Sequence, residues 1–140
     1  MTTHVLFVCT GNICRSPLAE YYARAFWKDR DVITSSAGTW AMIGSKSTAD
    51  MVTVGAENGL DLTPHRARPL GSADSPDLIL CIEKHHVDAA MQAFPNLPDG
   101  AIRLLVATGV GDPYRRPIDA YHRSAALIIE GIETVELPSS

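Results

Sequence analysis

The sequence contains no apolar run long enough to span a membrane, and no secretory signal at its start. It also has no run of Lys or Arg. Its 12 basic residues are outnumbered by 16 acidic ones, which gives a net charge of −4. These absences argue against a membrane protein and against a protein that binds nucleic acid. They favour a cytoplasmic location, with secretion independent of a signal as the alternative.

Cysteine is scarce as well, with three residues, Cys9, Cys14 and Cys81. An odd number without the spacing of zinc ligands argues against a disulfide scaffold and a zinc site. His85 and His86 are adjacent, and no complementary ligand cluster is visible near them, so we expect a solvent-exposed helix face there. We therefore predict reduced thiols, no metal and no cofactor.

Short apolar runs alternate along the chain with segments of helical character. The runs predict strands at 4–9, 32–36, 77–82 and 101–105, and the intervening segments predict helices at 16–30, 47–58, 83–93 and 118–137. Strict alternation predicts an α/β fold: a single three-layer domain over residues 1–140, with a central four-stranded parallel sheet and helices on both faces. Ligands of such folds bind beyond the carboxyl ends of the strands. The loops after the first and fourth strands belong at that edge.

The first predicted strand ends at Cys9, and a short loop then leads to Arg15. A loop of this length can curl around a tetrahedral anion, with backbone N–H groups and a helix N-terminus directed at it. Arg15 can bind two oxygens, and Gly11 and Asn12 tolerate the positive φ that such a curl needs. These surroundings favour a thiolate at Cys9, which is a nucleophile. Ser16 suits the N-cap of the helix that follows. The alternative is a buried core cysteine beside an unrelated arginine.

Several motifs together resemble the low-molecular-weight protein tyrosine phosphatase family. They are VCTGNICRSPLAE at 8–20, SSAGTW at 35–40, H-x-A-R at 65–68, DLILC at 77–81 and DPY at 112–114, in order over nearly the whole chain. The resemblance implies hydrolysis of phosphotyrosine through a phosphocysteine, with no cofactor. It implies a phosphate-binding loop after the first strand, made of Cys9, Thr10, Gly11, Asn12, Ile13, Cys14, Arg15 and Ser16. Cys9 would be the nucleophile and Arg15 a phosphate ligand.

Asp112 is the candidate general acid and base. It lies in GDPY, a rigid loop expected at the same edge of the sheet as Cys9. The resemblance assigns this role to the Asp of the DPY motif. On the dipeptide alone, an ordinary Asp-Pro turn is the simpler interpretation.

The resemblance also predicts the surroundings of the phosphate. Tyr114, Ile13 and Trp40 would form substrate walls deep enough to favour phosphotyrosine over phosphoserine, although Trp40 as a partly buried packing residue is an equal alternative. Asn12, Ser16, Ser36 and His65 would form a supporting hydrogen-bond network. Cys14 would protect oxidised Cys9 as a disulfide, or simply pack the loop. Cys81 is expected to be buried and inert.

Three other functions compete with this prediction. A thioredoxin-coupled arsenate reductase shares the loop, but the further thiol expected after Cys81 is absent from CIEKHHVDAAM. A protein-arginine phosphatase carries Thr where this chain has Ile13. A phosphoprotein-binding domain without catalysis would have lost Cys9, Arg15 or Asp112. The expected partners are proteins with phosphotyrosine, phosphate or other oxyanions as product or inhibitor, and a cognate tyrosine kinase.

Overall fold

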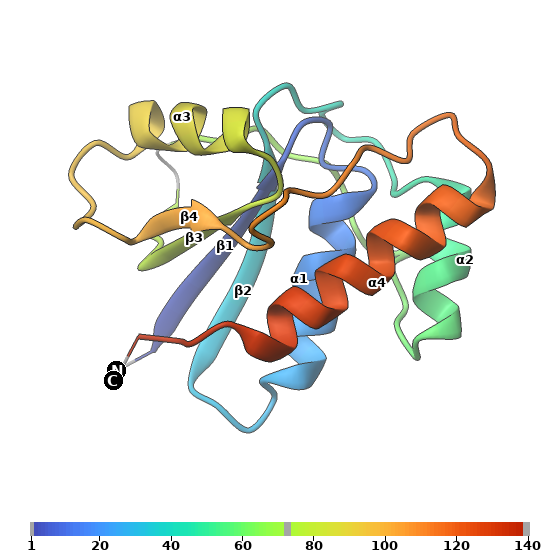
Figure 1. The fold of residues 1–140 in the computed structure, drawn as a ribbon, viewed down its shortest axis with the longest axis horizontal. Coiled ribbons are helices and arrows are strands. Elements are labelled where there is room, and N and C mark those ends of the chain that lie inside the picture. The colour runs from blue at the N-terminus through green and yellow to red at the C-terminus, as the bar shows by residue number, and fades with distance from the viewer. Residues whose placement is uncertain (1, 72–73, 139–140) are drawn as a thin grey trace.

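The structure is a computed structural model that describes residues 2–71 and 74–138. The predicted domain limits, residues 1 and 140, lie outside the described residues. Strands and helices alternate as predicted (Figure 1). In chain order they are β1 (Thr3–Cys9), α1 (Arg15–Phe26), β2 (Val32–Gly38), α2 (Ala49–Glu57), β3 (Leu78–Cys81), α3 (Lys84–Ala93), β4 (Ile102–Leu104) and α4 (Ile118–Thr134).

All four strands pair in parallel, in the order β2-β1-β3-β4. β1 is central, and successive side chains point to opposite faces of the sheet. Phe7 belongs to the core cluster on one face, and Leu6 and Val8 belong to the cluster on the other. Because both clusters are buried, β1 reads as a continuous apolar run. The predicted four-stranded parallel sheet is confirmed.

Helices cover both faces of the sheet, as predicted (Figure 1). α1 packs against β1, β2 and α4, and α2 packs against α4 and α1 on the same side. α3 packs against β1, β3 and β4 on the other side. None of the helices in the described part of the chain combines the length and the apolar character needed to cross a membrane.

The start of α1 differs from the prediction. The helix begins at Arg15, and Cys14 occupies the N-cap position without a side-chain capping bond. The assignment of Ser16 as N-cap is therefore wrong. Its hydroxyl lies within the first turn, where other polar groups compete for it.

The loops that follow β1 and β4 meet at the carboxyl edge of the sheet (Figure 1). The end of β2 approaches the first of these loops so closely that only glycine fits at residue 38. A Cβ on Gly38 would come within 2.4 Å of the Thr10 carbonyl oxygen. Close contact between these two backbones therefore forms one wall at this edge of the sheet.

Candidate active site

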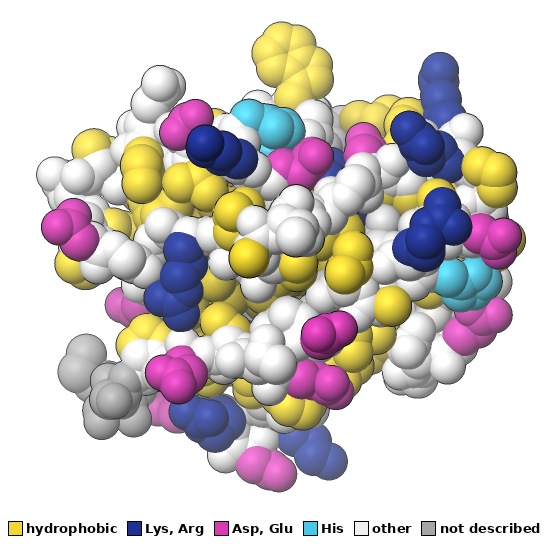
Figure 2. Space-filling view, viewed as in Figure 1, with side chains coloured by type: hydrophobic (Ala, Val, Ile, Leu, Met, Phe, Trp, Pro, Cys, Tyr) yellow, Lys and Arg dark blue, Asp and Glu magenta, His cyan; other side chains and the backbone are white. Residues whose placement is uncertain are grey.

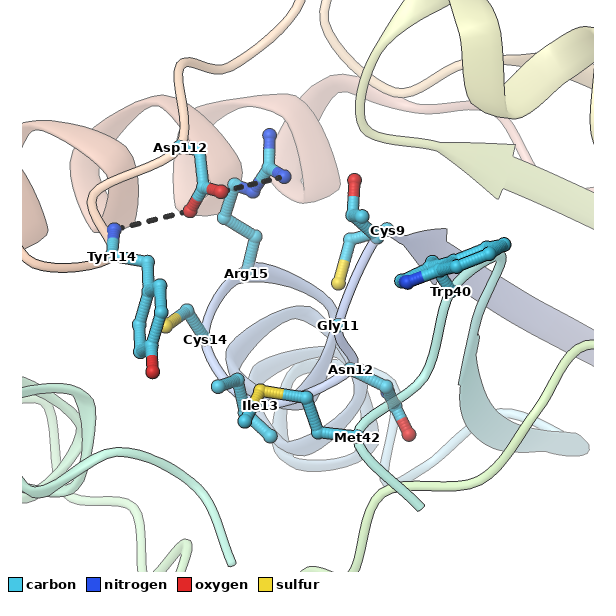
Figure 3. A pocket seen from close by; sticks show the side chains of 11 residues that line it. Cys9, Gly11, Asn12, Ile13, Cys14, Arg15, Trp40, Met42, Asp112 and Tyr114 are labelled. Carbon is cyan, nitrogen blue, oxygen red and sulfur yellow. Dashed lines mark hydrogen bonds and ion pairs between the residues drawn. The ribbon is translucent and has the colours of Figure 1, made fainter. Parts of the chain in front are cut away.

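A pocket of about 170 Å³ lies at the carboxyl edge of the sheet. The β1–α1 loop forms its base, and Asp112 and Tyr114 approach from the loop before α4, while Trp40 comes from the β2–α2 segment (Figure 3). The structure thus brings together residues that are more than a hundred positions apart in the chain. The full lining is Cys9, Thr10, Gly11, Asn12, Ile13, Cys14, Arg15, Trp40, Met42, Asp112 and Tyr114.

The backbone of the β1–α1 loop has its carbonyl groups turned outward. Four of them accept hydrogen bonds from the 39–48 segment: Cys9 O from Thr39 N at 2.9 Å, Thr10 O from Trp40 N at 3.0 Å, Gly11 O from Met42 N at 3.0 Å and Ile13 O from Thr48 N at 2.9 Å. The N–H groups of residues 11–14 donate to no other described residue. Outward carbonyls leave these donors facing the pocket, which is the arrangement of an anion-binding nest.

Asn12 holds the curl of this loop. It has φ of 59°, in the left-handed region that asparagine tolerates better than most residues. Its carbonyl oxygen accepts from His65 Nε2 at 2.7 Å, and its Oδ1 accepts from Arg68 N at 2.9 Å. Its Nδ2 donates to Ser16 Oγ at 2.8 Å and to Ser36 Oγ at 3.0 Å. The residues predicted as a supporting network are therefore joined through Asn12.

Ser16 connects this network to the sulfur of Cys9. The two atoms, Ser16 Oγ and Cys9 Sγ, lie 2.8 Å apart. Because Ser16 Oγ already accepts from Asn12, its hydroxyl hydrogen is available to the sulfur. A donor at this place stabilises a thiolate, and Cys9 is only 2% exposed, so water contributes little.

Arg15 is buried, and protein groups fix one end of its guanidinium. Nη1 donates to Glu83 Oε2 at 2.8 Å and to the Val110 carbonyl at 2.7 Å. Nη2 lies 3.8 Å from Asp112 Oδ2 at the pocket. Burial alone would raise the pKa of Glu83, but the hydrogen bond and charge of Arg15 lower it below its usual range. Glu83 is thus an anionic anchor that sequence reasoning missed.

His86 is a second residue that sequence reasoning misplaced. It is fully buried, so the expectation of a solvent-exposed histidine pair is wrong for this residue. Glu83 N–H donates to His86 Nδ1 at 2.9 Å. The proton of the neutral ring is therefore on Nε2, which lies 2.8 Å from Thr10 Oγ1 in the β1–α1 loop. The spacing Glu83-x-x-His86 at a helix start resembles a capping box and was the available signal.

Glu83, His85 and His86 place ligand atoms within 4.8 Å of one another. The expectation that no ligand cluster surrounds the histidines is corrected by this grouping. However, Glu83 Oε2 binds Arg15, and both ring nitrogens of His86 have hydrogen-bond partners. A metal ion bound by all three would have to displace these bonds, so the arrangement favours the support of Arg15 and Thr10 over metal binding.

Aromatic side chains stand on opposite sides of the pocket mouth (Figure 3). Tyr114 is 37% exposed and Trp40 is 82% exposed. Such exposure contradicts the alternative that Trp40 is a partly buried packing residue. Ile13 lies deeper, and Met42, which sequence reasoning missed, completes the apolar part of the lining. Asp112 is held beside this slot by Tyr114 N–H, which donates to its Oδ1 at 3.1 Å.

The three cysteines are free thiols in different environments. Cys14 is buried, with Sγ 3.4 Å from Thr48 Oγ1, and burial raises its pKa to about 11. Burial raises the pKa of Cys81 to about 12, which agrees with the prediction of an inert cysteine. A redox role for Cys14 stays a prediction.

Comparison with known proteins gives consistent matches. A family model described as low molecular weight phosphotyrosine protein phosphatase matches residues 4–135. The low molecular weight protein-tyrosine-phosphatase Wzb of Escherichia coli is 32% identical over 127 residues, which cover 86% of this chain and 84% of that protein. The structure of Vibrio vulnificus Wzb in complex with benzylphosphonate aligns with a TM-score of 0.86 and 31% identity, over 95% of this chain and 96% of that one. YwlE arginine phosphatase from Geobacillus stearothermophilus aligns with a TM-score of 0.83 and 28% identity, over 94% and 88%.

Proposed function

The chain belongs to the low molecular weight phosphotyrosine protein phosphatase family, and from this premise we propose that Cys9, Arg15 and Asp112 hydrolyse phosphotyrosine in proteins. The observation that carries the proposal is the joint position of the three groups around one anion-binding pocket. A sulfur nucleophile, a fixed cation and a carboxyl group are the parts that this reaction needs.

In the first step the Cys9 thiolate attacks phosphorus, and the bond from phosphorus to the tyrosine oxygen breaks. The inward N–H groups of the loop and the guanidinium of Arg15 stabilise charge on the phosphoryl oxygens. Asp112 donates a proton to the departing tyrosine oxygen. Its position beside Tyr114 supports this role, because the aromatic slot would bring that oxygen to the carboxyl group. The product is a phosphocysteine at residue 9.

In the second step water hydrolyses the phosphocysteine. Asp112 is now a carboxylate and takes a proton from the attacking water, while the sulfur of Cys9 leaves as a thiolate. The hydroxyl of Ser16, held by Asn12, stabilises that leaving sulfur. Inorganic phosphate is released, and the supporting network of Asn12, Ser16, Ser36 and His65 keeps the loop in place through both steps.

The aromatic slot supports selectivity for phosphotyrosine. A phenyl ring between Tyr114 and Trp40 carries its phosphate to the level of Cys9, whereas the shorter side chain of phosphoserine does not reach it. The benzylphosphonate in the related Vibrio vulnificus structure combines a phenyl ring with a phosphonate in the same way. Apolar Ile13 on the pocket floor favours aryl substrates over phosphoarginine, the substrate class suggested by the similarity to YwlE.

The test is phosphate release, without added metal, from one peptide carrying phosphotyrosine, phosphoserine or phosphoarginine. We expect turnover of the phosphotyrosine peptide alone, with none for Cys9→Ser and a loss of about a hundredfold or more for Asp112→Asn. Preference for phosphoarginine would refute the inference that Ile13 favours aryl substrates, but it would leave the proposed mechanism unchanged. Folded wild-type protein that releases no phosphate from any of the three peptides would refute the proposed function.

Further features stay predictions that follow from the proposed function. Proteins with phosphotyrosine are its expected partners, and phosphate or another oxyanion would inhibit it by occupying the loop. A cognate tyrosine kinase and a cytoplasmic location are also predictions. Microscopy of cells that express the tagged protein would test the location. Co-purification of a tyrosine kinase with the tagged protein would test the partner.

A further inference from the structure

A second hollow of about 310 Å³ lies behind Asp112, between the DPY loop and the first half of α4. Asp112 lines both this hollow and the catalytic pocket, so one side chain separates the two. The walls are held in place, because Ser124 Oγ on α4 donates to the Gly111 carbonyl at 3.1 Å. A group bound here would lie directly beside the phosphorylated residue of a substrate.

Two arginines, Arg116 and Arg123, line this hollow. Both are exposed, and neither side chain has a hydrogen bond or ion pair with another described residue. Arg15 and Arg68, by contrast, each bind a carboxylate of the chain. Figure 2 shows basic side chains gathered over the loop that precedes α4 and over the first turns of that helix. This is a local positive surface on a protein of net charge −4.

The charged neighbours, which include Asp119 one turn before Arg123 on α4, form no hydrogen bond or ion pair with these two guanidiniums in the described structure. Arg115 faces the other side of the loop, with its guanidinium 5.3 Å from the centre of the Tyr114 ring. His122 binds Glu57 at 2.8 Å. Asp112 is the acidic residue among those that line the hollow, and it is directed at Arg15 Nη2 and at the backbone N–H of Tyr114.

We propose that Arg116 and Arg123 bind a carboxylate of the substrate, from an Asp or Glu close in sequence to the phosphotyrosine. The proposal rests on the proposed function. An extended peptide advances about 3.3 Å per residue, so a side chain two or three residues from the phosphotyrosine is displaced from it by about 7–10 Å. Asp112 lines both pockets, so a displacement of this order leads from one pocket to the other. Planar guanidiniums suit carboxylate recognition, and the site would make the enzyme selective for acidic phosphotyrosine segments.

The test uses phosphotyrosine peptides in which one Glu is moved through the three positions on either side of phosphotyrosine, each with a matched Gln peptide. For wild type we expect at least one position at which Glu raises kcat/KM about fivefold to tenfold over Gln, mainly through KM, and less with added NaCl. The double variant Arg116→Gln with Arg123→Gln should lose that preference. It should keep wild-type activity on p-nitrophenyl phosphate and on the Gln peptides.

Lys28→Gln with Arg30→Gln is the control for net charge, because it also removes two positive charges. Both residues are exposed and lie just before β2, at the amino edge of the sheet and away from both pockets. This control should keep the full preference for Glu. If wild type hydrolyses the Gln peptides but shows no preference for Glu at any position, or if the variant at Arg116 and Arg123 keeps the preference, the carboxylate site is refuted and the phosphatase proposal survives. If wild type hydrolyses neither the peptides nor p-nitrophenyl phosphate, both proposals are refuted.

Discussion

Replacing His86 tests whether a neutral, buried imidazole supports the phosphate-binding loop. His86 links the backbone N–H of Glu83 to the hydroxyl of Thr10. Burial, followed by the positive charges of His85 and Arg15, lowers its pKa from 6.5 to about 4, while Glu83 opposes the shift. The native protein therefore resists protonation of a side chain that the unfolded chain protonates readily.

The sign and size of the effect follow from these two pKa values. Between about pH 6.5 and about pH 4 the unfolded state binds a proton that the native state does not. The contribution of neutral His86 to the free energy of unfolding is therefore fully present above about pH 6.5, and it decreases as the pH drops through that window. With about 1.4 kcal/mol for each pH unit, the loss approaches about 3 kcal/mol at the acid end. His86→Asn removes this loss, because asparagine does not titrate.

The assay is urea unfolding at several pH values between about 7.5 and about 4, with circular dichroism as the signal that monitors unfolding. At the upper end His86→Asn should be less stable than wild type by about 1–3 kcal/mol, because hydrogen bonds to Thr10 and Glu83 are weakened. The difference should narrow steadily on acidification. Ser124→Ala, which removes a hydrogen bond to the Gly111 carbonyl and no titratable group, is the control and should keep a constant difference from wild type. Parallel stability curves for wild type and His86→Asn would refute the reasoning.

Two further predictions concern groups around the pocket. Glu83→Ala should lower kcat/KM for p-nitrophenyl phosphate about tenfold to a hundredfold, because Arg15 loses its anionic anchor. Glu83→Gln should lose less activity. Equal activity of wild type and Glu83→Ala would contradict this prediction. Iodoacetamide at neutral pH should label Cys9 far faster than Cys14 or Cys81, because pKa values of about 11 and about 12 keep the latter two as thiols. Peptide mass spectrometry would measure this, and equal labelling of Cys9 and Cys14 would oppose it.

The sequence by itself determined the sheet and the phosphate-binding loop. In the β1 run both alternating sets of side chains are apolar, and only a strand covered on both faces buries them all. Cys9 and Arg15 are separated by one short loop, so their proximity follows from local spacing. The segment GDPY follows a strand, which already assigned Asp112 to the same edge of the sheet.

Tertiary structure alone decided that Glu83 and His86 support that loop, whereas the sequence motifs had already indicated Ser36 and His65. Glu83 and His86 lie in a helix start that looks like an ordinary polar surface, and they reach Arg15 and Thr10 only because β3 pairs directly with β1. The helix-capping role expected for Ser16 was likewise wrong because of tertiary partners. Its hydroxyl is hydrogen-bonded to Asn12 and to the sulfur of Cys9. The sequence directly determines which residues are close through local spacing. Contacts between residues that follow neighbouring strands depend instead on strand order, which is determined by the packing of the whole core.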